Sequence, residues 1–175
     1  ISFPDTRDVS PEDYILMVGG KTSALFSACA KIGAIVGGAN RREVKMLASF
    51  AWDAGIAFQI VDDILGVTAN DTTLGKPIGS DLREGKKTLI VVYALKNTAS
   101  REKENLLRVL GDQNADSQDI DAAIEILRSS GAINYAKKKA AEYVKSSKES
   151  LKVFPDIQAR QDLLELVDYF SSRDY

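Results

Sequence analysis

The segment from Met46 to Val61 carries a single formal charge, Asp53, and has apolar residues on every side of a helix. A helix that is apolar all round has to be enclosed by other elements. The segment is too short to cross a bilayer and contains Asp53 and Gln59, so we expect no transmembrane segment and no signal peptide. The chain must therefore fold so that this helix lies in its core.

Two helix starts can be recognised before this segment, and the second of them begins the helix that contains it. Ser10, followed by Pro11 and two acids, is typical of a helix start. The helix meets glycines at 19 and 20 and resumes as a run of small residues over 22–39. Asn40 can cap a second long helix that runs to about residue 67. A polar loop that contains several glycines is expected over 68–85.

The remaining long segments also predict helices. We expect one over 87–99, in spite of a run of β-branched residues, and a short charged one over 101–110. Apolar stripes at helical spacing follow. The stripe residues are Ile120, Ile124 and Leu127; Ile133, Ala136, Ala140, Tyr143, Val144 and Leu151; and Leu163, Leu164, Val167 and Phe170. The sequence therefore predicts an all-α helical bundle, with residues 1–175 as a single domain.

Composition narrows the chemistry that is available. The formal net charge of −2 does not favour nucleic acid as a partner. The absence of histidine removes Ser–His and Cys–His nucleophile pairs and histidine metal ligands, which leaves carboxylates, lysines and hydroxyls. The single cysteine, Cys29, excludes an internal disulfide and fits a reducing compartment. We expect a cytoplasmic protein.

The apolar helix ends on acids. Asp62 and Asp63 are adjacent, and Gln59 lies one turn before both on the same helix face. Two carboxylates at the mouth of a core repel one another and resist desolvation, and a magnesium ion relieves both costs because it prefers oxygen ligands. Taken alone, the pair is more typical of solvated acids at the end of a helix, because charged residues there are mostly exposed.

Lysines alternate with glycines in the loop that follows. Lys76 and Lys86 each follow a glycine, and Asp81 lies between them. Cations, an acid and tight backbone turns suit a diphosphate bound together with its metal, although an ordinary surface loop has similar residues. A nucleotide-binding P-loop is excluded, because Lys87 separates Lys86 from the hydroxyl residue that the motif requires directly after its lysine.

Together these motifs resemble the second aspartate-rich region of the trans-polyprenyl diphosphate synthases. The resemblance extends from Lys21-Thr22 to the final helix and so covers nearly the whole chain. It implies an all-α bundle of the isoprenoid synthase type, a homodimer, Mg²⁺ as cofactor, and the condensation of isopentenyl diphosphate with an allylic diphosphate. The loop looks most like that of short-chain synthases of the geranylgeranyl type.

The resemblance also implies roles for single residues. Asp62 would be the principal metal ligand, with Asp63 beside it. Contacts to the substrate diphosphate would come from three lysines, with a hydroxyl and an amide close by that steer the carbocation and the departing proton. These residues are Lys21, Lys76, Lys86, Thr22 and Gln59.

Two departures from the family pattern stand out. The family's second motif often has a third acid one turn after the first, where this chain has Gly66. Asp81 is a candidate to replace that metal ligand. The first aspartate-rich motif, expected on an earlier helix, is not found before Asp62. We therefore expect that the N-terminal half is absent and that this chain alone has negligible activity.

Two other functions remain open at this point. A non-catalytic subunit could keep the fold and partner an active synthase, and a class I terpene cyclase shares the fold and the ionisation chemistry. The retained acids and lysines favour an enzyme over a structural subunit. The lysines at 76 and 86 favour a synthase over a cyclase.

Overall fold

The computed structural model describes residues 9–68 and 78–172, and every regular element in that part of the chain is helical. Lys76, a predicted diphosphate contact, lies outside the described residues. The elements, in chain order, are α1 (Pro11–Val18), the π-helix η1 (Gly19–Ser23), α2 (Ala24–Val36), α3 (Arg41–Thr68), α5 (Ser80–Arg83), α6 (Leu89–Asn97), α7 (Ser100–Val109), α8 (Ser117–Ser129), α9 (Ala132–Ser150), the 3₁₀ turn η2 (Leu151–Val153) and α10 (Gln158–Ser171). The predicted all-α class is confirmed.

The chain forms two compact units, and each is described by itself. Residues 1–14, 62–137 and 174–175 make the first unit, and residues 15–61 and 138–173 make the second. Three helices, α1, α3 and α9, each contribute residues to both. That residues 1–175 form a single domain stays a prediction.

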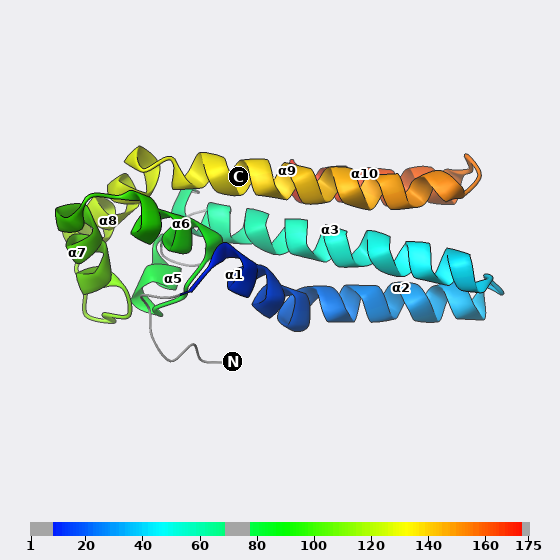
Figure 1. The fold of residues 1–175 in the computed structure, drawn as a ribbon, viewed down its shortest axis with the longest axis horizontal. Helices are drawn as coiled ribbons and strands as arrows, with labels where there is room; N and C mark the ends of the chain where they lie inside the picture. Colours follow the sequence, from blue (N-terminus) through cyan, green and yellow to red (C-terminus); the bar gives the residue numbers. More distant parts are fainter. Residues whose placement is uncertain (1–8, 69–77, 173–175) are drawn as a thin grey trace. The chain divides into compact units, whose positions relative to one another are not determined.

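The second unit is a bundle of long helices. Figure 1 shows α2, most of α3, most of α9 and α10 running alongside one another. Their shared core includes Phe50 and Ala54 of α3, Leu151 of η2 and Val167 of α10, each buried. Phe58 of α3 packs edge-on against Phe170 of α10, with ring centroids 5.1 Å apart. The stripes read from the sequence are therefore the faces that meet in this core.

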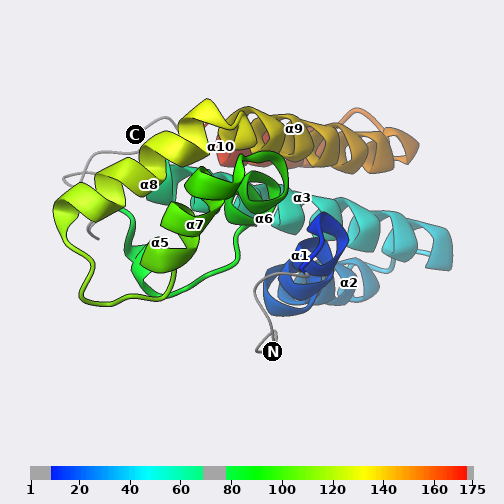
Figure 2. The same ribbon diagram turned by 60° about the vertical axis from the view of Figure 1, so that its left-hand side comes forward.

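The first unit is built from shorter helices around α6. Figure 2 shows α6, α7 and α8 packed together, with α5 beside them. Residues 89–92 of α6 are almost fully buried, so the run of β-branched residues is a core helix and not a strand. Thr88 caps it by accepting a hydrogen bond from the amide of Val91. The predicted helix over 87–99 is thus confirmed.

The loop expected over 68–85 contains a helical turn that the sequence did not reveal. Residues Ser80–Arg83 form α5, which buries Leu82 almost completely. The turn begins after Gly79 and is followed by Gly85, both with positive φ angles, +73° and +71°. A four-residue helix is too short to produce an apolar stripe, and for that reason periodicity cannot detect it.

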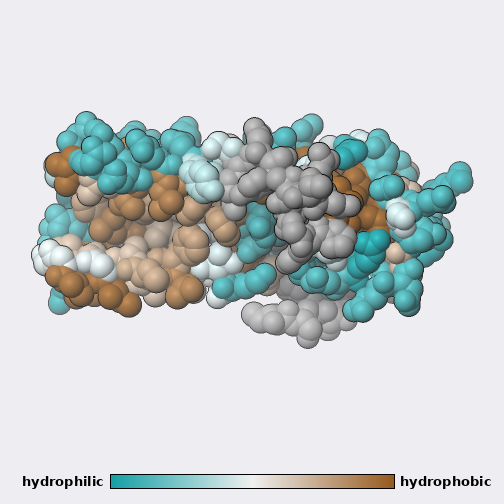
Figure 3. Space-filling view, turned by 180° about the vertical axis from the view of Figure 1, so that it is seen from behind, coloured by the Kyte–Doolittle hydropathy of each residue, from teal (hydrophilic) through white to brown (hydrophobic). Residues whose placement is uncertain are grey.

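One face of the second unit exposes apolar side chains, as Figure 3 shows. On α2 the exposed residues are Leu25, Ile32, Ile35 and Val36. In the described part of the chain, Pro11–Val36 and Arg41–Thr68 are long and apolar enough to cross a membrane. Helices in the core of a soluble protein can be equally long and apolar. Of the most apolar 18 residues, 56% are buried in Arg41–Thr68 and 22% in Pro11–Val36. The absence of a transmembrane segment stays a prediction.

Replacing Gly79 with alanine tests the packing of α5. A Cβ at this position would lie 2.4 Å from Cγ2 of the buried Ile120, and φ is +73°. Gly131 is a matched control, because its φ is +76° and no atom lies within 4 Å of the place that a Cβ would occupy. We expect Gly131→Ala to lower the free energy of unfolding by about 1–2 kcal/mol from backbone strain alone. Gly79→Ala should lose about 1–3 kcal/mol more from overpacking. Urea denaturation measures both, and equal losses would contradict the packing described here.

Candidate functional site

The C-terminal end of α3 places the two adjacent aspartates in different surroundings. Asp62 is exposed, whereas Asp63 is buried with 7% of its surface accessible. Neighbouring residues on a helix point about 100° apart, so one of the two faces solvent and the other faces the core of the first unit. An exposed carboxylate suits a metal ligand that shares its ion with water and phosphate oxygens.

The buried aspartate has a partner that the sequence did not reveal. The Tyr14 hydroxyl on α1 donates a hydrogen bond to Oδ2 of Asp63 at 2.6 Å. Tyr14 is 1% exposed. Burial, and then the negative charge of Asp63, raise the pKa of Tyr14 well above its ordinary value. The phenol therefore keeps its proton and acts as the donor.

The place of the missing third acid is filled from the loop. A Cβ built on Gly66 would lie 3.0 Å from Oδ2 of Asp81, so the Asp81 carboxylate occupies the space next to Gly66. The Gly79 amide donates to the Gly66 carbonyl at 3.1 Å and ties the start of α5 to the end of α3. A side chain at position 66 would compete with Asp81 for this space. Glycine therefore permits the loop acid to approach the helix.

Lys86 pairs with the same acid. Its Nζ atom lies 2.6 Å from Oδ1 of Asp81 and 2.9 Å from Oε2 of Glu84. Partial burial acts to lower the pKa of Lys86, but hydrogen bonds and the charges of Asp81 and Glu84 outweigh it and the pKa is raised. The lysine is thus a permanent cation, and 40% of its side chain is exposed and accessible to an anion.

In the second unit, Thr22 and Gln59 are brought together. The Thr22 hydroxyl donates to Oε1 of Gln59 at 2.9 Å. Both belong to the predicted set, and Lys21 beside them is exposed. Thr22 lies in η1, where the helix widens to π geometry, a form that is frequent at functional sites.

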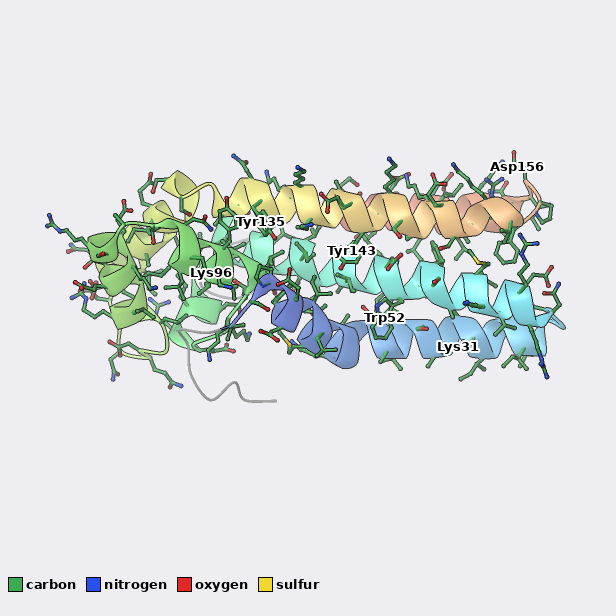
Figure 4. All side chains as sticks on the ribbon, viewed as in Figure 1. Lys31, Trp52, Lys96, Tyr135, Tyr143 and Asp156 are labelled. Carbon is green, nitrogen blue, oxygen red and sulfur yellow. The ribbon has the colours of Figure 1, made fainter. Side chains whose placement is uncertain are left out.

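Glycines explain why η1 and α3 approach so closely. A Cβ on Gly55 of α3 would lie 2.9 Å from the backbone Cα of Ser23. A Cβ on Gly19 would lie 2.6 Å from the ring of Trp52, which points from α3 toward α2 in Figure 4. The Ser23 hydroxyl is buried in this contact without a hydrogen-bond partner among the described residues. The contact holds Thr22 within reach of Gln59.

The oxygen donors suit magnesium, but they do not form a compact cluster. Carboxylate, carbonyl and water oxygens are the ligands that a hard divalent cation prefers. Within residues 9–68 and 78–172, no group of three or more histidine, cysteine or acidic side chains is close enough to hold a metal ion. Asp62, Asp63 and Asp81 therefore fit magnesium by donor type, and further oxygens, such as those of a diphosphate, would have to complete the shell.

Comparison with known proteins gives a consistent result. The family model described as polyprenyl synthetase matches residues 2–127. A short chain isoprenyl diphosphate synthase of Methanothermobacter thermautotrophicus is 39% identical over 100% of this chain and 53% of its own length. The chain thus spans about half the length of the curated relatives that it matches.

Solved structures show the same likeness. Geranylgeranyl pyrophosphate synthetase from Pyrococcus horikoshii superposes with a TM-score of 0.88 at 40% identity, over 97% of this chain and 51% of the other. A polyprenyl synthase from Caulobacter crescentus, solved with calcium and isoprenyl diphosphate, gives a TM-score of 0.89 at 33% identity, over 97% of this chain and 52% of the other.

Alanine at position 55 tests the contact that places Thr22. The added Cβ meets backbone as well as side chain of Ser23, so η1 has to move away from α3. We expect Gly55→Ala to lower the free energy of unfolding by about 1–3 kcal/mol. Gly33→Ala on α2, where no atom lies within 4 Å of the added Cβ, should raise it by about 0.5–1 kcal/mol. Urea denaturation of the two variants checks this, and a neutral Gly55→Ala would show that the helices do not cross so closely.

Proposed function

This chain belongs to the polyprenyl synthetase family, and from that premise we propose that it supplies the magnesium–diphosphate part of a short-chain trans-prenyltransferase. The observation that carries the proposal is the Asp81 carboxylate beside Gly66, in the first unit and one turn along α3 from Asp62. Asp62 and Asp81 would hold the ion through their oxygens, with Asp63 beside Asp62 as a further ligand. Bound magnesium neutralises charge on the diphosphate and so favours its departure.

Cations of the chain would bind the same leaving group. Lys86 is partly exposed and already aligned with Asp81, so a diphosphate would meet an acid and a base held 2.6 Å apart. Lys76 and Lys21 complete the proposed set of diphosphate contacts. Positive charges that are fixed in place before the reaction stabilise the negative charge that develops as the carbon–oxygen bond breaks.

We assign the Thr22–Gln59 pair to the organic part of the substrate. Loss of diphosphate leaves an allylic cation, which the alkene of isopentenyl diphosphate attacks before a proton is lost. The hydroxyl of Thr22 donates to Gln59, so its own oxygen lone pairs remain directed away from that bond. An oxygen lone pair near the allylic carbons would stabilise the cation and direct the proton, which is a catalytic role.

The whole enzyme requires more than this chain. The relatives are about twice as long, and the proposed function includes a further helical part that brings the first aspartate-rich motif. We propose isopentenyl diphosphate and an allylic diphosphate as substrates, a product of geranylgeranyl or similar length, a cytoplasmic homodimer, and no nucleic acid partner. The 175 residues alone would have negligible activity.

The metal site can be tested on the chain itself. Magnesium with inorganic diphosphate should raise the melting temperature, because a ligand that binds only the folded state stabilises it. Asp62→Asn should abolish the rise, and Asp81→Asn should reduce it by half or more. Asp121→Asn, an exposed acid on α8 of the same unit, is the control and should behave as the parent chain. A rise that survives Asp62→Asn would contradict the proposed ligand.

Measuring product formation tests the rest of the proposed function, the condensation reaction and the need for a further helical part. The intact gene product, given isopentenyl and dimethylallyl diphosphates with magnesium, should form an allylic product of about geranylgeranyl length, identified by mass spectrometry. The 175-residue chain under the same conditions should give no detectable product. Condensation by the chain alone would show that the further helical part is not required.

A further inference from the structure

Tyr14 and Asp63 form a buried contact between residues 49 positions apart in the sequence. Both belong to the first unit, Tyr14 on α1 and Asp63 at the end of α3. The tyrosine is 1% exposed and the aspartate 7%. A hydrogen bond from a hydroxyl to a carboxylate is about twice as strong as one between neutral groups, and burial protects it from competing water.

The backbone that carries Tyr14 is fixed by the start of its helix. Ser10 and Asp13 bond reciprocally: the Asp13 amide donates to the Ser10 hydroxyl at 3.1 Å, and the Ser10 amide donates to the Asp13 carboxylate at 2.9 Å. The Tyr14 amide donates to the Ser10 carbonyl. Val9 and Tyr14 occupy the two positions of a hydrophobic staple, and both are buried. The hydroxyl is therefore presented to Asp63 from a rigid support.

The bond constrains the aspartate pair. A carboxylate with one oxygen held at 2.6 Å cannot turn about its side-chain bonds without breaking that contact. Asp62 is the preceding residue on the same helix, so a fixed Asp63 also resists rotation or fraying of the last turns of α3. Partners that orient a metal-binding carboxylate are required for tight binding, and their loss typically costs about 10–100-fold in metal affinity.

We propose that Tyr14 is a positioning residue for the metal site, which holds Asp63 so that the Asp62–Asp63 pair presents its oxygens in one fixed arrangement. The inference rests on the proposed function, since it requires that the pair binds magnesium. It adds a residue outside the aspartate-rich motif and the lysine loop. A purely structural Tyr14 would stabilise the fold without affecting the metal.

Removal of the hydroxyl alone separates these two roles. Tyr14→Phe keeps the ring and its packing. Tyr93→Phe is the matched control, because Tyr93 lies in the same unit and packs through its ring, stacked on Tyr135 at a centroid distance of 4.3 Å. The measurement is the affinity of the full 175-residue chain for magnesium in the presence of inorganic diphosphate, by isothermal titration calorimetry, with the melting temperature of each metal-free variant recorded in parallel.

Tyr14→Phe is expected to weaken magnesium binding about 10-fold or more, while Tyr93→Phe leaves it within about 2-fold of the parent. Asp63→Asn should weaken it as well, and the double variant Tyr14→Phe/Asp63→Asn should bind no more weakly than Asp63→Asn alone, because the tyrosine acts through the aspartate. The last comparison separates positioning from a general loss of stability, which would add to the effect of Asp63→Asn.

The outcomes are distinct. Parental magnesium affinity in Tyr14→Phe, together with lost binding in Asp62→Asn, overturns the inference and leaves the proposed function standing. Additive losses in the double variant also overturn it. A parent chain that binds no magnesium with diphosphate, or an Asp62→Asn variant that binds as the parent does, refutes the proposed metal site and this inference with it.

Discussion

The end of α3 is where burial and charge meet, and the other features of the structure depend on how that conflict is resolved. The C-terminal half of the helix is mostly buried, with Ile56, Ala57 and Ile60 almost inaccessible to solvent. It then carries two acids on successive residues. A buried charge costs free energy unless it has a partner, and here one acid is exposed whereas the other receives a hydroxyl. The same helix thus serves as core for both units and as the base of the candidate site.

Helix periodicity predicts most of this fold because the stripes are long. The segments that became α8, α9 and α10 repeat their apolar residues from turn to turn, and burial in the structure follows those stripes. The helical state of residues 89–92 was harder to predict from the sequence, because β-branched side chains favour strands. Their almost complete burial explains why the helix prevails. The turn α5 was missed because its four residues make only one turn, too short for an apolar position to recur.

The candidate site, too, was predicted from the sequence only in part. Asp62, Asp81 and Lys86 were predicted from residue chemistry, and the structure places the Asp81 carboxylate next to Gly66. That Asp81 replaces the missing acid as a metal ligand stays a prediction. Tyr14 was not predicted. Nothing in the sequence pairs it with a residue 49 positions away, because such a pairing depends on how α1 packs on α3. The only local signal was the start of the helix at Ser10, which fixed where α1 begins.

The close approach of Asp81 to Gly66 couples a position on the helix to the loop. A Cβ added at position 66 would lie 3.0 Å from Oδ2 of Asp81, so the end of that side chain would have to shift by a few tenths of an ångström to accept it. Any side chain at position 66 therefore moves the carboxylate that also pairs with Lys86 at 2.6 Å. Position 66 on the helix and the lysine in the loop are thus coupled through one carboxylate, although they are 20 positions apart in the sequence.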